Sequence, residues 1–208
     1  ADSPPRTFHA GAAEVDINPL HYPVRVNGMV EEREATSAAD TLMSRALVLD
    51  DGTVRLAIVV VDNLMLPRTL LDDVKLLVSQ QTRIPTDRIL ISATHTHSAP
   101  SAMACLGSRV DPAYAEFLPG RIVTSIIEAE KKLQPARAGW TVITDEKHNH
   151  CRRWIFRPDR MMTDPFGVAS VRAHMHPGYQ SANHIGPSGP ADTDLSLLSI
   201  QTLDGKPL

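Results

Sequence analysis

Residues 54–94, with the order strand, helix, strand, are the feature that most constrains the fold of this chain. Residues 54–61 are continuously apolar, which is typical of a central strand. Residues 67–80 carry leucine and valine at helical spacing, which predicts an amphipathic helix packed on the sheet. Residues 88–94 contain another short apolar run and are predicted to form a second strand. This order predicts a right-handed βαβ unit with parallel strands.

A β-hairpin is predicted just before this unit. Residues 45–49 and 54–61 flank Asp51-Gly52, and Asp-Gly between apolar runs is a strong hairpin signal. Apolar periodicity predicts further elements: strands at 11–18, 136–144 and 195–202, and a helix at 113–133 interrupted at Pro119-Gly120. The predicted fold class is therefore α/β, with a mixed, largely central β-sheet and flanking helices.

Residues 145–193 show little apolar periodicity and are predicted to be a long polar loop region within a single domain of residues 1–208. A polar loop of this length in a compact domain is usually functional or disordered. Its aromatic and arginine content argues against simple disorder.

Charge and composition argue against several classes of function. The net charge is −3 with neutral histidines, so no nucleic-acid partner is predicted. The sequence also has no polybasic run of the kind that binds an anionic membrane surface. No apolar run approaches the length of a transmembrane segment. Two cysteines, Cys105 and Cys151, do not make a disulfide framework, and the sequence does not decide whether they pair. The start at Ala1 without methionine is typical of a mature, secreted or periplasmic protein whose signal peptide has been removed, although a cloning boundary would look the same.

Two histidines follow the strand predicted at residues 88–94. Because Pro100 ends the segment, we expect the strand to stop near His97 or Ser98. Residues two apart on a strand point to the same side, roughly 7 Å apart, so His95 and His97 are expected to share a pocket. Ligands gather at this edge of α/β sheets, and neutral imidazole is a good zinc ligand. The alternative is a pair of ordinary surface histidines.

Asp62 follows the other strand of the βαβ unit. Because the two strands are expected to be parallel, Asp62 and His95 should emerge at the same edge of the sheet. Asp62 either contacts a site there or caps the following helix, and capping is slightly favoured.

The segment Ser92–Pro100, which reads Ser-Ala-Thr-His-Thr-His-Ser-Ala-Pro, resembles the zinc-site motif of the neutral/alkaline ceramidases, a family of secreted amide hydrolases. Ala99 stands where the family usually has glycine. Weaker similarity covers most of the chain and includes residues 11–19, 133–137 and 186–192.

The resemblance implies a zinc-dependent hydrolase that cleaves an amide (N-acyl) bond in N-acylsphingosine or another small-molecule or lipid amide. It implies that His95 binds Zn²⁺ and that His97 orients or polarises the substrate. Arg152 corresponds to an arginine near the same pocket. Cys151 replaces the asparagine that precedes this arginine in the family, so the choice between Arg152 and Arg153 stays open.

In the ceramidases a second histidine, a glutamate and a tyrosine complete the zinc site, and all lie later in the sequence than this chain extends. The resemblance therefore implies the incomplete N-terminal part of a larger catalytic domain, completed by the C-terminal remainder of the same protein. Two alternatives stay open. One is another metal-dependent amidohydrolase of the barrel type, although too few residues follow His97 for the rest of such a barrel. The other is a non-catalytic secreted domain or fragment that retains the fold.

Overall fold

The computed structural model describes residues 7–178 and 180–208, which form two compact units. The first unit extends to Ala138 and includes Ile200–Leu208, and the second is Gly139–Ser199. No helix in these described ranges is both long enough and apolar enough to span a membrane.

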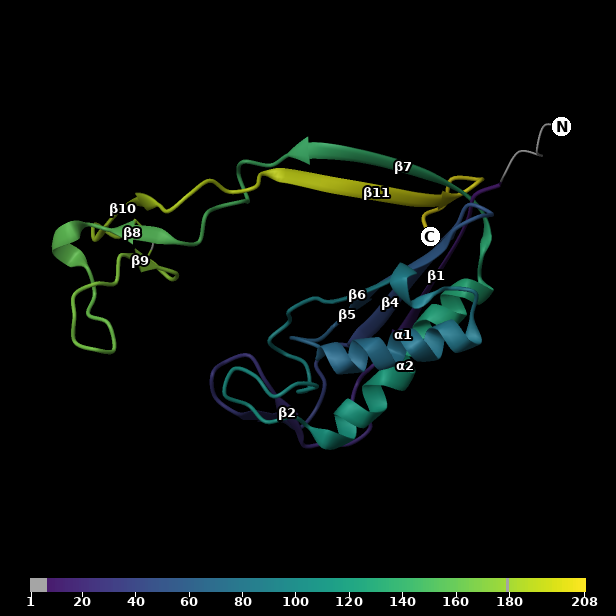
Figure 1. Ribbon diagram of the computed structural model, residues 1–208, viewed down its shortest axis with the longest axis horizontal. Helices are drawn as coiled ribbons and strands as arrows, with labels where there is room; N and C mark the ends of the chain where they lie inside the picture. The colour runs from purple at the N-terminus through teal and green to yellow at the C-terminus, as the bar shows by residue number, and fades with distance from the viewer. Residues whose placement is uncertain (1–6, 179) are drawn as a thin grey trace. The chain divides into compact units, whose positions relative to one another are not determined.

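A six-stranded mixed sheet is the main feature of the first unit, with two of its strands continuing into the second (Figure 1). Its order is β11 (Asp194–Thr202), β7 (Gln134–Thr144), β1 (His9–Asp16), β4 (Met43–Asp50), β5 (Arg55–Val61) and β6 (Ile89–Ala93). The β4–β5 pair is antiparallel and the β5–β6 pair is parallel. The predicted hairpin, βαβ unit and mixed α/β fold class are therefore confirmed.

Two helices, α1 (Arg68–Gln81) and α2 (Pro112–Lys131), pack against the sheet. The core between them includes Val59, Val74, Ile122 and Ile126, all with no exposed surface. Burying each such side chain contributes about 1.5–3 kcal/mol to folding. The core thus explains the helical spacing of leucine and valine in the sequence.

The predicted interruption of the second helix is wrong, because α2 continues through Pro119. Asp111 caps its start, since the Asp111 carboxylate accepts a hydrogen bond from the Tyr114 main-chain N–H at 3.1 Å. Leu118 and Ile122, on either side of the proline, are fully buried. Their burial stabilises α2 and offsets the loss of the main-chain hydrogen bond that Pro119 cannot donate.

The face of the sheet opposite the two helices is more exposed to solvent than the continuous apolar sequence of β5 predicted. β5 has a neighbouring strand on each side, as expected for a strand inside the sheet. However, Val60 is 37% exposed and Leu90 of the adjacent β6 is 61% exposed. The described residues therefore cover one face of β5 fully and the other only in part.

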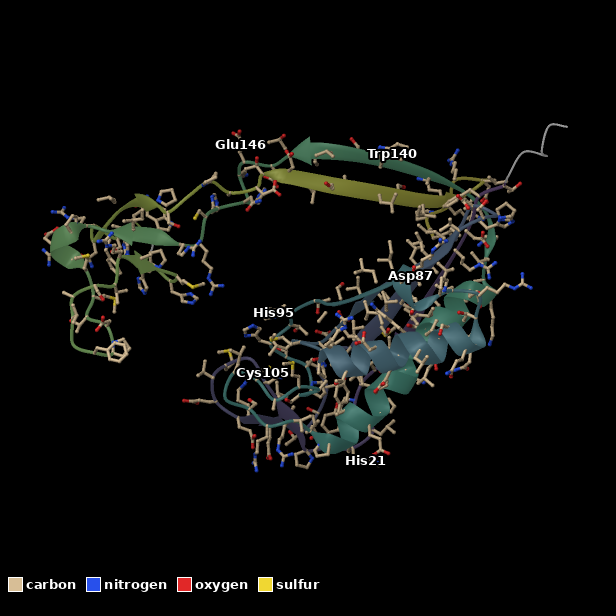
Figure 2. All side chains as sticks on the ribbon, in the orientation of Figure 1. His21, Asp87, His95, Cys105, Trp140 and Glu146 are labelled. Atoms are coloured by element: carbon tan, nitrogen blue, oxygen red, sulfur yellow. The ribbon has the colours of Figure 1, made fainter. Side chains whose placement is uncertain are left out.

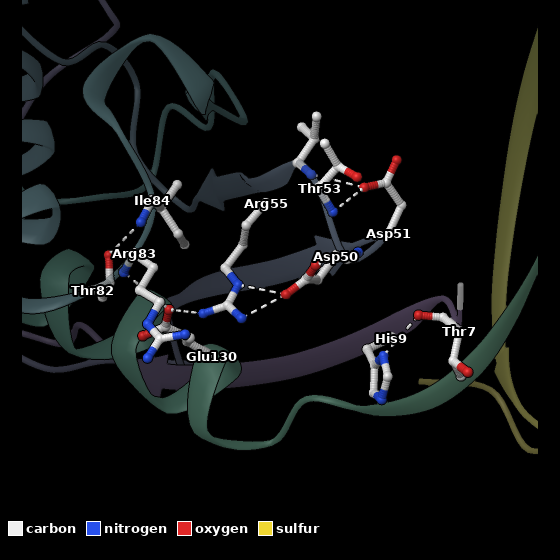
Figure 3. Close-up of polar contacts among 12 residues, drawn as sticks. Thr7, His9, Asp50, Asp51, Thr53, Arg55, Thr82, Arg83, Ile84 and Glu130 are labelled. Carbon is white, nitrogen blue, oxygen red and sulfur yellow. Dashed lines mark hydrogen bonds and ion pairs between the residues drawn. The ribbon is translucent and has the colours of Figure 1, made fainter. Parts of the chain in front are cut away.

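An ion-pair cluster joins the far end of the sheet to α2 (Figure 3). The guanidinium of Arg55 donates to Asp50 at 2.5 Å and to Glu130 at 2.6 Å. Glu130 also accepts from the main-chain N–H of Arg83 at 3.2 Å. The cluster fixes the last turn of α2 against the β4–β5 hairpin.

Three smaller elements complete the first unit: β2 (Val24–Val26), β3 (Arg33–Ala35) and the 3-10 helix η1 (Thr86–Arg88). β2 and β3 form an antiparallel pair, with Val24 opposite Ala35 and Val26 opposite Arg33. This hairpin was not predicted, because strands of three residues are too short to show a period.

The second unit contains strands where a long polar loop was predicted over residues 145–193. β8 (Trp154–Phe156) lies between β10 (His184–Pro187) and β9 (Ala173–His174), and a 3-10 helix, η2, spans Pro158–Arg160. The ring of Phe156 stacks on those of His184 and His174, with centroid distances of 4.5 and 5.4 Å. These strands are too short to be recognised from alternation, and loops connect them.

Candidate functional site

The segments that follow β5 and β6 meet at one edge of the sheet, as predicted. The Thr94 main-chain N–H donates to the Val61 carbonyl at 3.0 Å. Nδ1 of His95 lies 3.1 Å from the Leu64 carbonyl oxygen. Figure 2 shows Asp87 and His95 at opposite ends of β6, with His95 beyond its carboxyl end. This is the edge at which α/β folds bind ligands.

The strand ends earlier than expected, and the two histidines lie in the loop that follows. β6 stops at Ala93, and His95 adopts a left-handed conformation with φ of 62°. The prediction that both imidazoles project from one strand is therefore wrong. The loop nevertheless brings them together, with ring centroids 5.1 Å apart and the rings nearly perpendicular, at 81°. His95 is exposed and His97 is half-buried.

Backbone strain accompanies this arrangement at His95. A left-handed conformation is unfavourable for a residue with a Cβ by about 1–2 kcal/mol, and surrounding contacts must hold it. Such strain is found disproportionately at functional sites. The conformation of His95 is therefore consistent with a role for its side chain beyond packing.

Three side chains hold the histidine loop by donating to its main-chain carbonyls. The pairs are Arg33 with His97 at 2.6 Å, Asn63 with Pro100 at 3.0 Å, and Asn27 with Met103 at 3.1 Å. Asn27 and Asn63 are fully buried, and Pro100 also forms a β-bridge with Val26. The loop is thus fixed by the end of β5 and by the β2–β3 hairpin.

Asp62 does not have the predicted capping role. Pro67 occupies the N-cap position of α1, and no side chain among the described residues caps that helix. The Asp62 carboxylate instead accepts from the main-chain N–H of Met43 at 3.0 Å and from the guanidinium of Arg45 at 2.7 Å. It therefore joins the end of β5 to the start of β4.

The orientation of His95 fits a zinc ligand. The Leu64 carbonyl oxygen can only accept a hydrogen bond, so its contact with Nδ1 favours the tautomer protonated at Nδ1 and leaves the ring's lone pair on Nε2. Metal-binding histidines commonly use their second nitrogen in this way. In residues 7–178 and 180–208, however, no group of three or more His, Cys, Asp or Glu is placed to hold a metal ion. The described chain supplies one fitting ligand, whereas a catalytic zinc needs about three.

A pocket of about 420 Å³ is lined in part by residues of the same loop. Val24, Val26 and Leu42 contribute apolar surface, and Thr96 and Ser98 contribute hydroxyls. Among the residues described, neither His95 nor His97 lines this pocket. Its volume lies in the range of small-molecule sites.

Arg152 belongs to the second unit, where it is exposed. Its Nη2 lies 2.8 Å from Nε2 of His176, and its Nε donates to the Met175 carbonyl at 3.3 Å. Its role beside the histidines stays a prediction. Within the described residues, Cys105, in the first unit, and Cys151, in the second, are both free thiols.

Sequence reasoning missed the residues that hold the loop. Asn63 carried a weak signal, since it is a polar residue directly after a buried strand. Asn27 and Arg33 lie in a mixed, polar segment far from the histidines in sequence, and no pattern marked either residue individually.

The protein is thus an α/β protein with a histidine loop fixed at the carboxyl edge of its sheet. No family model and no curated protein matches the sequence. Solved structures do match by fold. A "Ceramidase complexed with C2" has a TM-score of 0.67 and 18% identity over 97% of this chain, and a neutral ceramidase from Pseudomonas aeruginosa gives the same two values over 99%.

The chain spans 30% and 31% of the lengths of these two ceramidase chains. Its fold is therefore similar to part of a neutral ceramidase, as the sequence motif indicated. At 18% identity the similarity is one of fold.

Proposed function

We propose that this chain is part of a zinc-dependent hydrolase that cleaves the amide bond of an N-acylated lipid, as a ceramidase does. The observation that carries the proposal is His95, whose Nδ1 lies 3.1 Å from the Leu64 carbonyl oxygen at the carboxyl edge of the sheet, a contact that favours a lone pair on Nε2. The fold similarity to neutral ceramidases supports the same reaction class. N-acylsphingosine or a related lipid amide is the proposed substrate, and the proposed location is extracellular or periplasmic.

Each proposed site residue has a distinct role in this mechanism. His95 is the metal ligand, through Nε2. Zinc, when bound, supplies a Lewis acid for the amide carbonyl and a water of lowered pKa. His97 donates a hydrogen bond to the oxygen that gains charge, or moves a proton to the leaving amine. Arg152 binds a substrate oxygen through its planar fork of donors.

The proposal requires ligands from outside the described chain. Because this chain spans 30% of the length of a ceramidase chain, we propose that the C-terminal remainder of the same protein supplies them. An isolated chain with one ligand should then bind zinc weakly, and the longer protein should bind it tightly.

Zinc titration of both the 208-residue chain and the longer protein tests this proposal. His95→Ala should weaken zinc binding by the longer protein more than about tenfold, since removing even a partner of a ligand has effects of this size. His21→Ala, at an exposed histidine away from the loop, is the control and should leave binding unchanged. Unchanged zinc affinity in His95→Ala would reject the assignment. A folded longer protein that neither binds zinc nor hydrolyses an N-acyl amide would instead favour the non-catalytic domain.

A further inference from the structure

The imidazole of His97 rests on a glycine from a distant part of the chain. A Cβ built on Gly28 would lie 2.8 Å from Cγ of His97 and 3.0 Å from its Nδ1. Real Cβ atoms do not approach this closely, so any side chain at position 28 would displace the ring. Gly28 also has φ of +109°, which L-residues rarely adopt. Residue 28 is therefore constrained to glycine by the ring and by its own backbone.

Arg33, from the same segment, holds the main chain of His97. Its Nη2 donates to the His97 carbonyl at 2.6 Å and to the Asn27 carbonyl at 3.1 Å. The Arg33 guanidinium thus links Asn27, which precedes Gly28, to His97. The ring and the backbone of His97 are both fixed by residues 27–33.

Residues 27–33 also contact Gly107 and Arg109. Glu32 forms an ion pair with Arg109 at 2.5 Å and accepts from its main-chain N–H at 2.9 Å. These contacts, with a contribution from nearby Arg25, lower the pKa of Glu32 to about 2. A Cβ on Gly107 would lie 2.1 Å from the Val30 carbonyl oxygen, so the two backbones are in direct contact. Residues 27–33 are therefore held by Gly107 and Arg109, from the later part of the β6–α2 connection, as well as by their contacts with His97.

We propose that residues 27–33 are the positioning element for His97, with Gly28 supporting the ring and Arg33 holding the main chain. In catalysis, which rests on the proposed function, this element would set the direction in which His97 presents its ring nitrogen. A displacement of about 1 Å in such a group lowers catalytic rates by about 100-fold. The positioning itself is a property of the folded chain and does not depend on zinc or activity.

Glycine substitutions test the support of the ring. Gly28→Ala is compared with Gly52→Ala, because Gly52 also has positive φ, of +84°, while no described heavy atom lies within 4 Å of its Cβ position. In NMR spectra of the chain, Gly28→Ala should shift the His97 ring signals and remove the contact between the residue 28 α-proton and the ring. Gly52→Ala should leave both unchanged. His97 signals that are equally unperturbed in the two variants would overturn the proposal.

Arginine substitutions provide a second test that survives if Gly28→Ala does not fold. Arg33 is exposed, so Arg33→Gln should fold and still shift the His97 signals, and Arg33→Lys should restore them in part. Arg68→Gln, at an exposed arginine on α1, is the matched control. No change in Arg33→Gln would contradict the role of Arg33.

The longer, zinc-loaded protein separates this inference from the proposed function. If it hydrolyses amides, Gly28→Ala should lower kcat by about 100-fold with little change in KM. If the ring shifts as expected but no form of the protein hydrolyses amides, the positioning element stands and the proposed function fails. If Gly28→Ala leaves kcat and the ring signals unchanged in an active protein, the positioning element fails alone.

Discussion

Replacing Gly11 by alanine should destabilise the first unit, because β1 and the end of α2 touch there through their backbones. A Cβ at Gly11 would lie 2.2 Å from the Ala129 carbonyl oxygen and 2.8 Å from the Leu133 main-chain nitrogen. Contacts with backbone cannot be relieved by rotating a side chain. The end of α2 must therefore move away from the sheet.

This movement affects well-packed and charged groups at once. Ala129 and Ile126 are fully buried, and Glu130 is paired with Arg55 at 2.6 Å. Overpacking of a core typically costs about 1–3 kcal/mol. Because the clash is with backbone, we expect Gly11→Ala to lower the free energy of unfolding by about 3 kcal/mol, which corresponds to a fall in Tm of about 6–12 °C for a chain of this size.

Urea unfolding followed by circular dichroism measures this effect, with Gly120→Ala as the matched control. Gly120 lies inside α2, and no described heavy atom lies within 4 Å of its Cβ position. Alanine there should raise the free energy of unfolding by about 0.8–1 kcal/mol through helix propensity. A Gly11→Ala protein within about 0.5 kcal/mol of the wild type would refute the close packing of α2 on β1, since surface substitutions have effects of that size.

Four further perturbations have definite expected outcomes. The hydroxyls of Ser44 and Ser125 are 2.9 Å apart and fully buried, and Ser125 also donates to a main-chain carbonyl. Ser125→Ala should therefore lower the free energy of unfolding in urea by about 1–3 kcal/mol, and Ser44→Ala by only about 1 kcal/mol. Pro119→Ala should raise the same quantity by about 1 kcal/mol or more, because it restores a helical N–H. The hydrogen bonds from Arg109 hold the pKa of Glu32 at about 2, so the stability that their ion pair contributes should be complete above a pH of about 4.3 and be lost as the pH falls through about 2, and NMR titration of Glu32 should give a midpoint near 2.

The parts of the fold that were predictable are those encoded by neighbouring residues. The β4–β5 hairpin follows from Asp51-Gly52 between apolar runs, and the parallel β5–β6 pair follows from the helix between them. The position of β1, between β4 and β7, depends on contacts between residues far apart in sequence, which periodicity does not contain. The continuity of α2 was missed for a related reason, since burial around Pro119 outweighs the local preference for a break.

The candidate site, like the fold, was predictable from the sequence only in part. Its location was predictable, because the parallel arrangement of β5 and β6 places Asn63 and His95 at one edge of the sheet. The conformation of the loop was not, because the left-handed turn at His95 is sustained by partners from other segments. Arg33, Asn63 and Asn27 hold three carbonyls of the loop, and they lie 64, 37 and 76 residues away in sequence from the residues that they bind.

The histidine motif of residues 94–100 does not determine the arrangement of its two imidazoles by itself. His95 and His97 face each other because the loop leaves the strand, not because they are two positions of a strand. Residues 94–100 placed after a strand in another protein would therefore lack the arrangement, since neither Gly28 nor Arg33 would accompany them. The two-imidazole site is a property of three chain segments that the first unit brings together.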